Sequence, residues 1–203
     1  MIKASLYNFL GKIYIPDSFD LNAPYLMHIS DTPSSIFGAL DALIKRIQPK
    51  IIVHTGDLVD NLKIGLYPSS FEGYKRYLKR LIRILEGGER QVIYAVGNHD
   101  DLDSIKKYSQ KGHFVPTYEK FTTDHFSYGI THDIADIPVS SDLPDILFFG
   151  HNLEKYSDYN SYPKYFNGLE KIALINLETG EIYTFDYPVG TKESRVIIYR
   201  KGL

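Results

Sequence analysis

The chain has 203 residues, with 23 basic and 25 acidic side chains, a formal charge of −2 and no cysteine. This length fits one domain that buries roughly 70% of its unfolded surface, so we expect residues 1–203 to form a single domain. The charge balance offers no general attraction to nucleic acid, and the lack of cysteine excludes disulfides, thiolate metal sites and a cysteine nucleophile.

The hydropathy pattern gives no sign of a membrane segment. No stretch approaches ~18 uninterrupted apolar residues, and no apolar core follows a basic start at the N-terminus. We therefore expect no membrane span, no signal peptide and a cytoplasmic protein.

The first half of the chain alternates strand and helix patterns. Residues 1–24 are expected to form an N-terminal extension, a strand or a lid, before the first core strand. Apolar, β-branched runs then predict strands that begin at Tyr25, Ile51 and Gln91. Helical spacing of apolar residues predicts helices over 34–47, 71–86 and 101–109. Strand, helix, strand in this order predicts βαβ units with right-handed crossovers.

From about residue 114 the helical period disappears and short strand patterns replace it. The predicted strands are 114–123, 125–131, 145–149, 170–177, 181–187 and 194–200. Glu178-Thr179-Gly180 reads as a hairpin turn between two of them. We therefore expect parallel βα units in the first half, mostly antiparallel strands in the second, and two packed sheets with helices outside.

Polar side chains follow five of the predicted strands. In an open α/β sheet, ligands bind outside the carboxyl ends of the strands. Carboxylate, amide and imidazole groups at these ends are donors that can hold a hard divalent ion. The candidate metal ligands are Asp31, Asp57, Asn98, His132 and His151.

These residues belong to motifs that occur in a defined order. They are Gly56-Asp57-Leu58-Val59-Asp60, Gly97-Asn98-His99-Asp100, Thr131-His132-Asp133 and Gly150-His151, with Asp31 upstream. The set resembles the calcineurin-like metallophosphoesterase family, in particular its small bacterial and archaeal phosphodiesterase branch. The resemblance implies an α/β (α+β) fold, a four-layer α/β/β/α sandwich of two mixed sheets, and an enzyme with two metal ions.

The resemblance also implies which metal ligands are present. One family site is complete here, with Asp57, Asn98, His132 and His151 as ligands. The other is degraded, because Pro33 stands where the family has a histidine after Asp31, and Leu153 stands where it has a second histidine after His151. We therefore expect one firm divalent ion, Mn²⁺ or alternatively Zn²⁺, Ni²⁺, Fe²⁺ or Mg²⁺, and a second that is weak or absent.

The catalytic roles implied by the family fall on His99 and Asp60. His99 would donate a proton to the leaving oxygen. Asp60 would orient His99 and raise its pKa, a task that Asp100 could share. The expected substrate is a small phosphate ester, with a phosphodiester favoured, hydrolysed by metal-activated water.

A second hypothesis stays open beside the enzyme. The loss of ligands at Pro33 and Leu153 favours a catalytically weak or inactive protein of this fold that acts as a protein-binding scaffold. A nuclease is disfavoured, since the chain has no basic arm. His28 and His54 lie inside strands and alternate away from the carboxylates, which favours a core role over metal binding. The sequence indicates neither the natural ester nor the oligomeric state.

Overall fold

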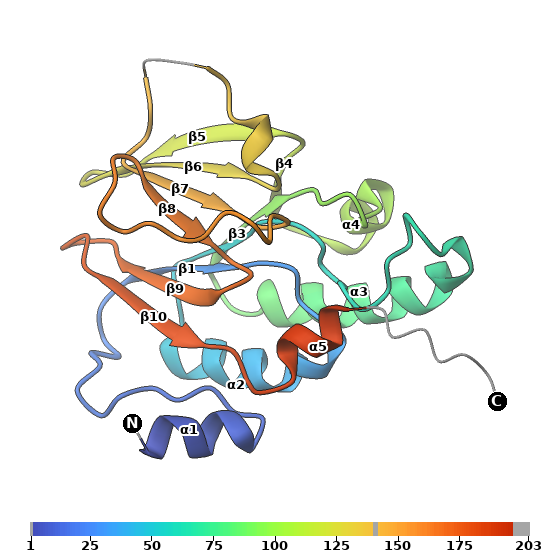
Figure 1. The fold of residues 1–203 in the computed structure, drawn as a ribbon, viewed down its shortest axis with the longest axis horizontal. Coiled ribbons are helices and arrows are strands. Elements are labelled where there is room, and N and C mark those ends of the chain that lie inside the picture. The colour runs from blue at the N-terminus through green and yellow to red at the C-terminus, as the bar shows by residue number, and fades with distance from the viewer. Residues whose placement is uncertain (1, 140–141, 197–203) are drawn as a thin grey trace.

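Two mixed β-sheets lie face to face in the computed structural model, which describes residues 2–139 and 142–196 (Figure 1). The larger sheet has the order β10-β9-β1-β2-β3-β4, in which β1 to β4 are parallel and β9 runs antiparallel to both β1 and β10. Its strands are β1 (Tyr25–Ile29), β2 (Ile51–His54), β3 (Gln91–Ala95), β4 (Gly112–Val115), β9 (Lys171–Asn176) and β10 (Ile182–Asp186).

The smaller sheet has four strands in the order β5-β6-β7-β8. They are β5 (Tyr118–Thr122), β6 (Ser127–Thr131), β7 (Ile146–Phe149) and β8 (Lys164–Asn167). The pairs β6–β7 and β7–β8 are parallel, so the prediction of mostly antiparallel strands is wrong here. The predicted strand 114–123 is in fact two strands, because the chain passes from the larger to the smaller sheet at Pro116 and Thr117.

Helices cover the outer face of the larger sheet. The short 3-10 helix η1 (Ser34–Ile36) leads into α2 (Phe37–Ile47), and η2 (Pro68–Ser70) leads into α3 (Phe71–Leu85), as predicted for 34–47 and 71–86. Each presents an apolar stripe at helical spacing to the sheet, such as Leu40, Leu43 and Ile47 of α2. The third predicted helix is α4 (Leu102–Tyr108).

The central strands of the larger sheet are buried on both faces, which explains their continuous apolar runs. One core cluster lies between this sheet and the helices. The other lies between the two sheets, where Val53 and Ile93 belong to the same cluster as Ile130 and Phe148. The candidate site lies at one edge of this second core, where strands of both sheets end.

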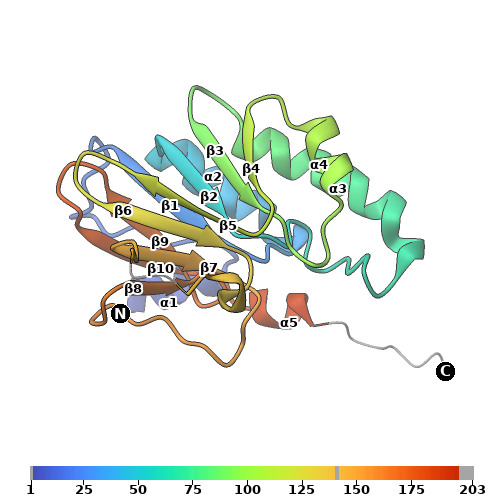
Figure 2. The same cartoon turned by 90° about the horizontal axis from the view of Figure 1, so that it is seen from above.

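The two-sheet α/β fold is confirmed, with one difference from a four-layer sandwich. Figure 2 looks onto the smaller sheet, and no α-helix of the described residues lies in front of it. The parallel connections 132–145 and 150–163 would normally carry helices. Their described residues form only the 3-10 helix η3 (Ile134–Asp136), because they lack an apolar helical period.

Two predictions at the ends of the chain are wrong. Residues 1–24 begin with a helix, α1 (Ile2–Phe9), and then contribute Ile13, Ile15 and Phe19 to the core. The predicted strand 194–200 begins inside a helix, α5 (Thr191–Arg195), while residues 197–200 lie outside the described part. Among the described residues, no helix has the length and apolar character needed to cross a membrane.

Candidate metal centre and active site

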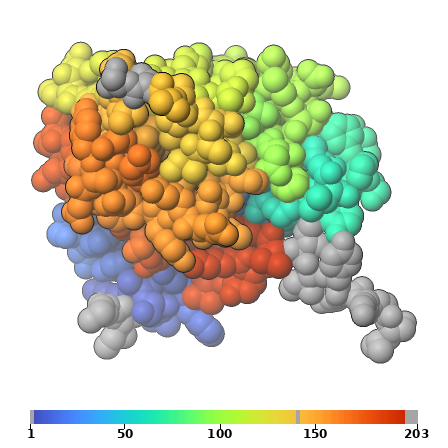
Figure 3. Space-filling view, turned by 45° about the horizontal axis from the view of Figure 1, so that its top comes forward, coloured from blue at the N-terminus to red at the C-terminus, as the bar shows by residue number. Residues whose placement is uncertain are grey.

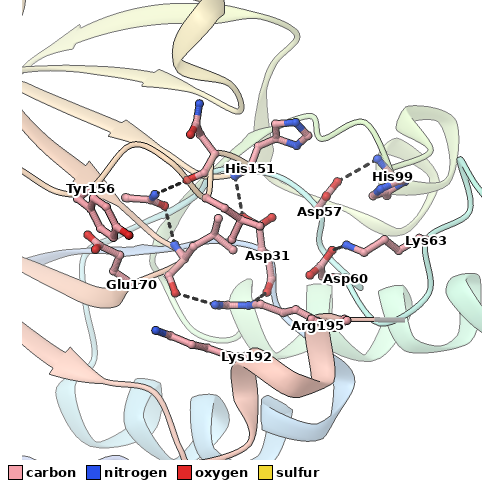
Figure 4. Close-up of a pocket in the computed structure, with 15 residues that line it drawn as sticks. Asp31, Asp57, Asp60, Lys63, His99, His151, Tyr156, Glu170, Lys192 and Arg195 are labelled. Atoms are coloured by element: carbon pink, nitrogen blue, oxygen red, sulfur yellow. Dashed lines mark hydrogen bonds and ion pairs between the residues drawn. The ribbon is translucent and has the colours of Figure 1, made fainter. Parts of the chain in front are cut away.

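Three of the predicted ligands follow strands in an unusual backbone conformation. Asp31 after β1, Asp57 after β2 and His151 after β7 have φ values of +47°, +52° and +56°. Positive φ is uncommon for residues other than glycine, and such residues concentrate at functional sites. These sharp turns direct three side chains into one region at the strand ends (Figure 4).

The four predicted ligands of the more complete site come together. Asp57, His132 and His151 each offer a ligand atom, and these atoms lie within 4.8 Å of one another. Nε2 of His132 is 3.0 Å from Oδ1 of Asn98 and 3.8 Å from Oδ1 of Asp57. Asp57 and Asn98 follow strands of the larger sheet, whereas His132 and His151 follow strands of the smaller one.

The ring of His132 shows what this cluster is suited to hold. Its Nδ1 lies 2.7 Å from the carbonyl oxygen of Thr55, which can only accept, so Nδ1 carries a proton. In the neutral ring, Nε2 then points a lone pair at two other acceptors, the oxygens of Asn98 and Asp57. Three acceptors this close are satisfied by a proton on Nε2 or by a metal ion between them, and the neutral ring with its proton on Nδ1 is the form that binds metals. The donor set therefore fits a divalent ion.

The electrostatics of His132 agree with that conclusion. Burial lowers the pKa of His132, but the negative charges of Asp57 and Asp31, together with the Thr55 carbonyl, outweigh it and raise the pKa. The site therefore favours positive charge at this position.

Asp100 supports the loop that carries Asp57. Its carboxylate accepts hydrogen bonds from the backbone N–H groups of Asp57 at 2.8 Å, Leu58 at 2.9 Å and Gly97 at 2.9 Å, and from the Tyr74 hydroxyl at 3.1 Å. These bonds join the turn after β2 to the turn after β3. The prediction that Asp100 orients His99 is therefore wrong, because its oxygens are committed to the backbone.

Glycines allow these turns to approach so closely. A Cβ on Gly97 would lie 2.2 Å from Oδ1 of Asp57, and one on Gly56 would lie 2.3 Å from Nδ1 of His132. Gly56 also has a φ of +97°. Glycine is required at both positions, since any side chain there would displace a metal ligand.

The other half of the site is rich in carboxylates. Oxygens of Asp31, Asp57 and Asp60 lie within 4.8 Å of one another. Asp31 is buried, and its Oδ2 accepts hydrogen bonds from the Ser30 hydroxyl and, at 3.3 Å, from the backbone N–H of His151. Burial, followed by the charge of Asp57, raises the pKa of Asp31. This half offers oxygens but no imidazole from positions 33 or 153.

His99 lies beside the metal ligands. Its backbone N–H donates to Oδ1 of Asp57 at 2.9 Å, and its Nε2 is 3.1 Å from Nδ2 of Asn98. Its Nδ1 is buried and has no hydrogen-bond partner within the described ranges. The ring lines a cavity of about 400 Å³ together with Asp31, Asp57 and His151.

Asp60 lies in the same cavity but is committed to a different partner. It forms an ion pair with Lys63, three residues further along the same turn of chain. The structure of residues 2–139 and 142–196 has no hydrogen bond between Asp60 and His99. Burial lowers the pKa of His99 against the opposing pull of Asp57 and Asp60. Asp60 therefore does not orient this ring by a hydrogen bond; its charge does raise the pKa of His99, as expected, but burial outweighs that effect.

The sequence profile of the calcineurin-like phosphoesterases matches residues 25–187. This chain belongs to that family. The predicted family is thus confirmed, and the protein is a metal-dependent phosphoesterase, a hydrolase acting on phosphoric ester bonds.

Solved structures that resemble this chain include two phosphoesterases. YfcE, a phosphoesterase from E. coli, superposes with a TM-score of 0.52 and 16% identity, covering 81% of this chain and 99% of that one. A metallophosphoesterase from Sphaerobacter thermophilus gives a TM-score of 0.48 and 13% identity, with coverages of 86% and 93%. At 16% identity the likeness to YfcE shows a shared fold alone. No curated protein matches the sequence.

Several residues of this phosphoesterase's cavity were missed by the sequence analysis. The cavity is also lined by Leu153 and Leu169. Figure 4 shows Tyr156, Glu170 and the cations Lys192 and Arg195 in the same lining. Arg195 lies in a segment predicted to be a strand, where no motif indicated a site. Its position depends on contacts with residues more than 160 positions away.

The two strand histidines of the metallophosphoesterase are core residues, as predicted. Nε2 of His28 is 2.9 Å from the Thr55 hydroxyl, and Nε2 of His54 is 3.0 Å from the Thr32 hydroxyl. Both threonines lie in the turns that precede or follow metal-site carboxylates. The histidines therefore hold the strand-end turns in place from the core and do not line the cavity.

Proposed function

We propose that this metallophosphoesterase hydrolyses a phosphodiester at one firmly bound divalent ion, held by Asp57, Asn98, His132 and His151. The observation that carries the proposal is the cluster of acceptors around Nε2 of His132. A bound divalent ion, for which Mn²⁺ is the first candidate, would lower the pKa of a water molecule and neutralise charge on the phosphate.

His99 is the proposed general acid. It lies one residue from Asn98 and lines the same cavity, within reach of an ester oxygen seated there. Burial lowers its pKa, but a bound phosphate adds a nearby negative charge that favours the protonated ring. The ring then holds the proton that the departing oxygen needs.

The lining of the cavity suits an anionic ester of phosphate, and its apolar part supports a diester over a monoester. Its lining has four carboxylates, those of Asp31, Asp57, Asp60 and Glu170, and three cationic side chains, those of Lys63, Lys192 and Arg195. One divalent ion would bring the formal total of these groups to +1, and the proton on His99 would add one more positive charge, which suits an anionic phosphate ester. The cavity also extends past Leu153 and Tyr156, which leaves apolar surface for a second ester group.

The test is the initial rate of hydrolysis of an aryl phosphodiester as Mn²⁺ is titrated. We expect saturable activity in the wild type and less with the corresponding aryl monoester. His132→Ala should abolish it because it removes a ligand, and His99→Ala should lower it by about 10²–10⁴-fold. His113→Ala is the matched control, since this exposed histidine pairs with Glu119 outside the site.

Two outcomes would contradict the proposal. Equal, near-zero rates in the wild type and in His132→Ala would favour the scaffold hypothesis, which rests on the ligands missing at Pro33 and Leu153. A clear preference for the monoester would retain the metal centre but overturn the choice of a diester.

A further inference from the structure

We propose that Arg195 is a substrate-binding residue that holds the phosphate group of the ester through N–H donors that no backbone carbonyl accepts. This inference rests on the proposed function and names the residue that replaces positive charge in the incomplete half of the site.

The first observation is the hydrogen bonding of the guanidinium group. Arg195 is only 7% exposed. Its Nε donates to the Asp31 carbonyl at 2.7 Å, Nη1 to the Leu169 carbonyl at 2.7 Å and Nη2 to the Ser30 carbonyl at 3.2 Å. A guanidinium has five N–H donors, so one on Nη1 and one on Nη2 are not taken by carbonyls, and the Tyr187 hydroxyl is a further hydrogen-bond partner of the group. No carboxylate of the described residues lies within ion-pair distance of it.

A buried cation without an anionic partner is unfavourable unless something supplies the missing charge. Backbone carbonyls satisfy three donors but carry no net charge. Arg195 nevertheless lines the cavity with Asp31, Asp57 and His99, so a ligand bound there can reach this side chain. A phosphate oxygen pair supplies both the negative charge and two acceptors in the geometry that a guanidinium fits.

The second observation is the place where Arg195 enters. Helix α5 contacts η1, which begins directly after Pro33, and Leu153 lines the cavity beside Arg195. Figure 3 shows the C-terminal segment in red between the orange segment that follows β7 and the teal segment near residue 70. The guanidinium is therefore on the side of the cavity where histidine ligands for a second ion are absent.

The third observation is that the group is held rigidly. The guanidinium lies over the ring of Tyr187, with Cζ 4.8 Å from the ring centroid, and the Tyr187 hydroxyl donates to the Gly168 carbonyl at 2.8 Å. Three carbonyls and one ring fix its plane. Little side-chain freedom remains to be lost when a ligand binds, which is the condition for tight recognition by a single residue.

The test measures binding of inorganic phosphate to the Mn²⁺-loaded protein by calorimetry. We expect Arg195→Ala to weaken the phosphate Kd by about 10-fold or more, because two charge-assisted hydrogen bonds are lost. Arg195→Lys keeps the charge but not the paired donors, so it should recover only part of the affinity. Arg46→Ala, which removes an exposed arginine on α2, should bind phosphate as the wild type does.

A second readout separates phosphate binding from a purely structural role. Loss of Arg195 removes a positive charge near Asp31, so Mn²⁺ should bind Arg195→Ala as tightly as the wild type or more tightly. The contrary result is that the variant loses Mn²⁺ affinity, with the phosphate Kd weakened by the same factor as the Mn²⁺ Kd. In that case Arg195 is a structural anchor and the inference is overturned. Arg195→Lys gives the same comparison if the alanine variant does not fold.

The two proposals fail in different ways. An unchanged phosphate Kd in both Arg195 variants, or no phosphate binding by an active wild type, overturns the inference and leaves the proposed function intact. Phosphate binding that depends on Arg195, in a protein without Mn²⁺-dependent diesterase activity, supports the inference and overturns the proposed function.

Discussion

Asp100 organises the site without facing the cavity. One carboxylate accepts three backbone N–H groups and a tyrosine hydroxyl, and it thereby fixes the turn from which Asp57 projects. His28 and His54 act in the same way from the core, through threonine hydroxyls. At the residue scale, the geometry of the ligands is therefore set by buried polar groups that never touch the metal.

Asp100→Asn should weaken both the fold and the metal centre. The amide group replaces one acceptor with a donor, so at least one buried N–H loses its partner. We expect the free energy of unfolding to fall by about 1–3 kcal/mol, with a weaker Mn²⁺ Kd. Urea denaturation and Mn²⁺ calorimetry measure the two effects. Asp103→Asn, an exposed residue of α4, is the control, and equal values for the two variants would contradict this role.

The core histidines predict how stability depends on pH. Burial lowers the pKa of His28 to about 3, so below pH ~6.5 the unfolded chain binds a proton that the folded protein does not. The free energy of unfolding therefore falls as pH decreases from 6.5 towards 3, by about 1.4 kcal/mol per pH unit from this residue.

His28→Gln should remove that contribution while keeping a polar group near Thr55. Between pH 7.5 and 5.5 we expect the variant to lose about 1.4 kcal/mol less stability than the wild type. The exposed His125 offers the control variant His125→Gln. Urea denaturation at both pH values measures the difference, and parallel losses in wild type and His28→Gln would refute it.

At the scale of elements, the strand-end turns determine the site. Positive φ at Asp31, Asp57 and His151 and glycines at 56 and 97 let loops from different strands meet within hydrogen-bond distance. The strands themselves contribute mainly buried apolar side chains, together with His28 and His54, which bond to threonines of the turns. The turns are short and tightly constrained, so a single added methyl group is enough to disturb them.

Gly97→Ala and Gly38→Ala should have opposite effects. A Cβ at Gly97 would meet Asp57 at 2.2 Å, so we expect about 1–3 kcal/mol of destabilisation and a weaker Mn²⁺ Kd. Gly38 lies in α2 with nothing within 4 Å of the added Cβ, so alanine there should stabilise by about 0.5–1 kcal/mol. Thermal unfolding and Mn²⁺ calorimetry compare them. If Gly97→Ala binds Mn²⁺ as tightly as the wild type does, the added Cβ does not displace Asp57 and the prediction is wrong.

At the scale of the whole molecule, the metal ligands bridge the two sheets. Asp57 and Asn98 come from the larger sheet, and His132 and His151 come from the smaller one. An ion held by all four would cross-link the sheets at one edge of their shared core. Without it, the carboxylates of Asp31, Asp57 and Asp60 remain close together and repel one another.

Mn²⁺ should therefore stabilise the entire fold. At a concentration 100 times its Kd, a ligand that binds only the folded state adds about 2.7 kcal/mol. For a chain of this size that corresponds to a rise in Tm of roughly 5–11 °C. Thermal melts with Mn²⁺ and with a chelator measure it, and His132→Ala should show little shift. An equal shift in that variant would indicate binding elsewhere on the protein.

The sequence by itself determined the βα units of the first half, the family, and the convergence of Asp57, Asn98, His132 and His151. Those features follow from local periodicity and from the rule that parallel strands end at one edge of a sheet. Only the tertiary structure decided the parallel pairing of β6, β7 and β8, the commitment of Asp100 to the backbone, and the presence of Arg195 in the cavity. These three features depend on contacts between segments that are far apart in the sequence. Packing and buried hydrogen bonds decide which segments meet, and local sequence patterns do not contain that information.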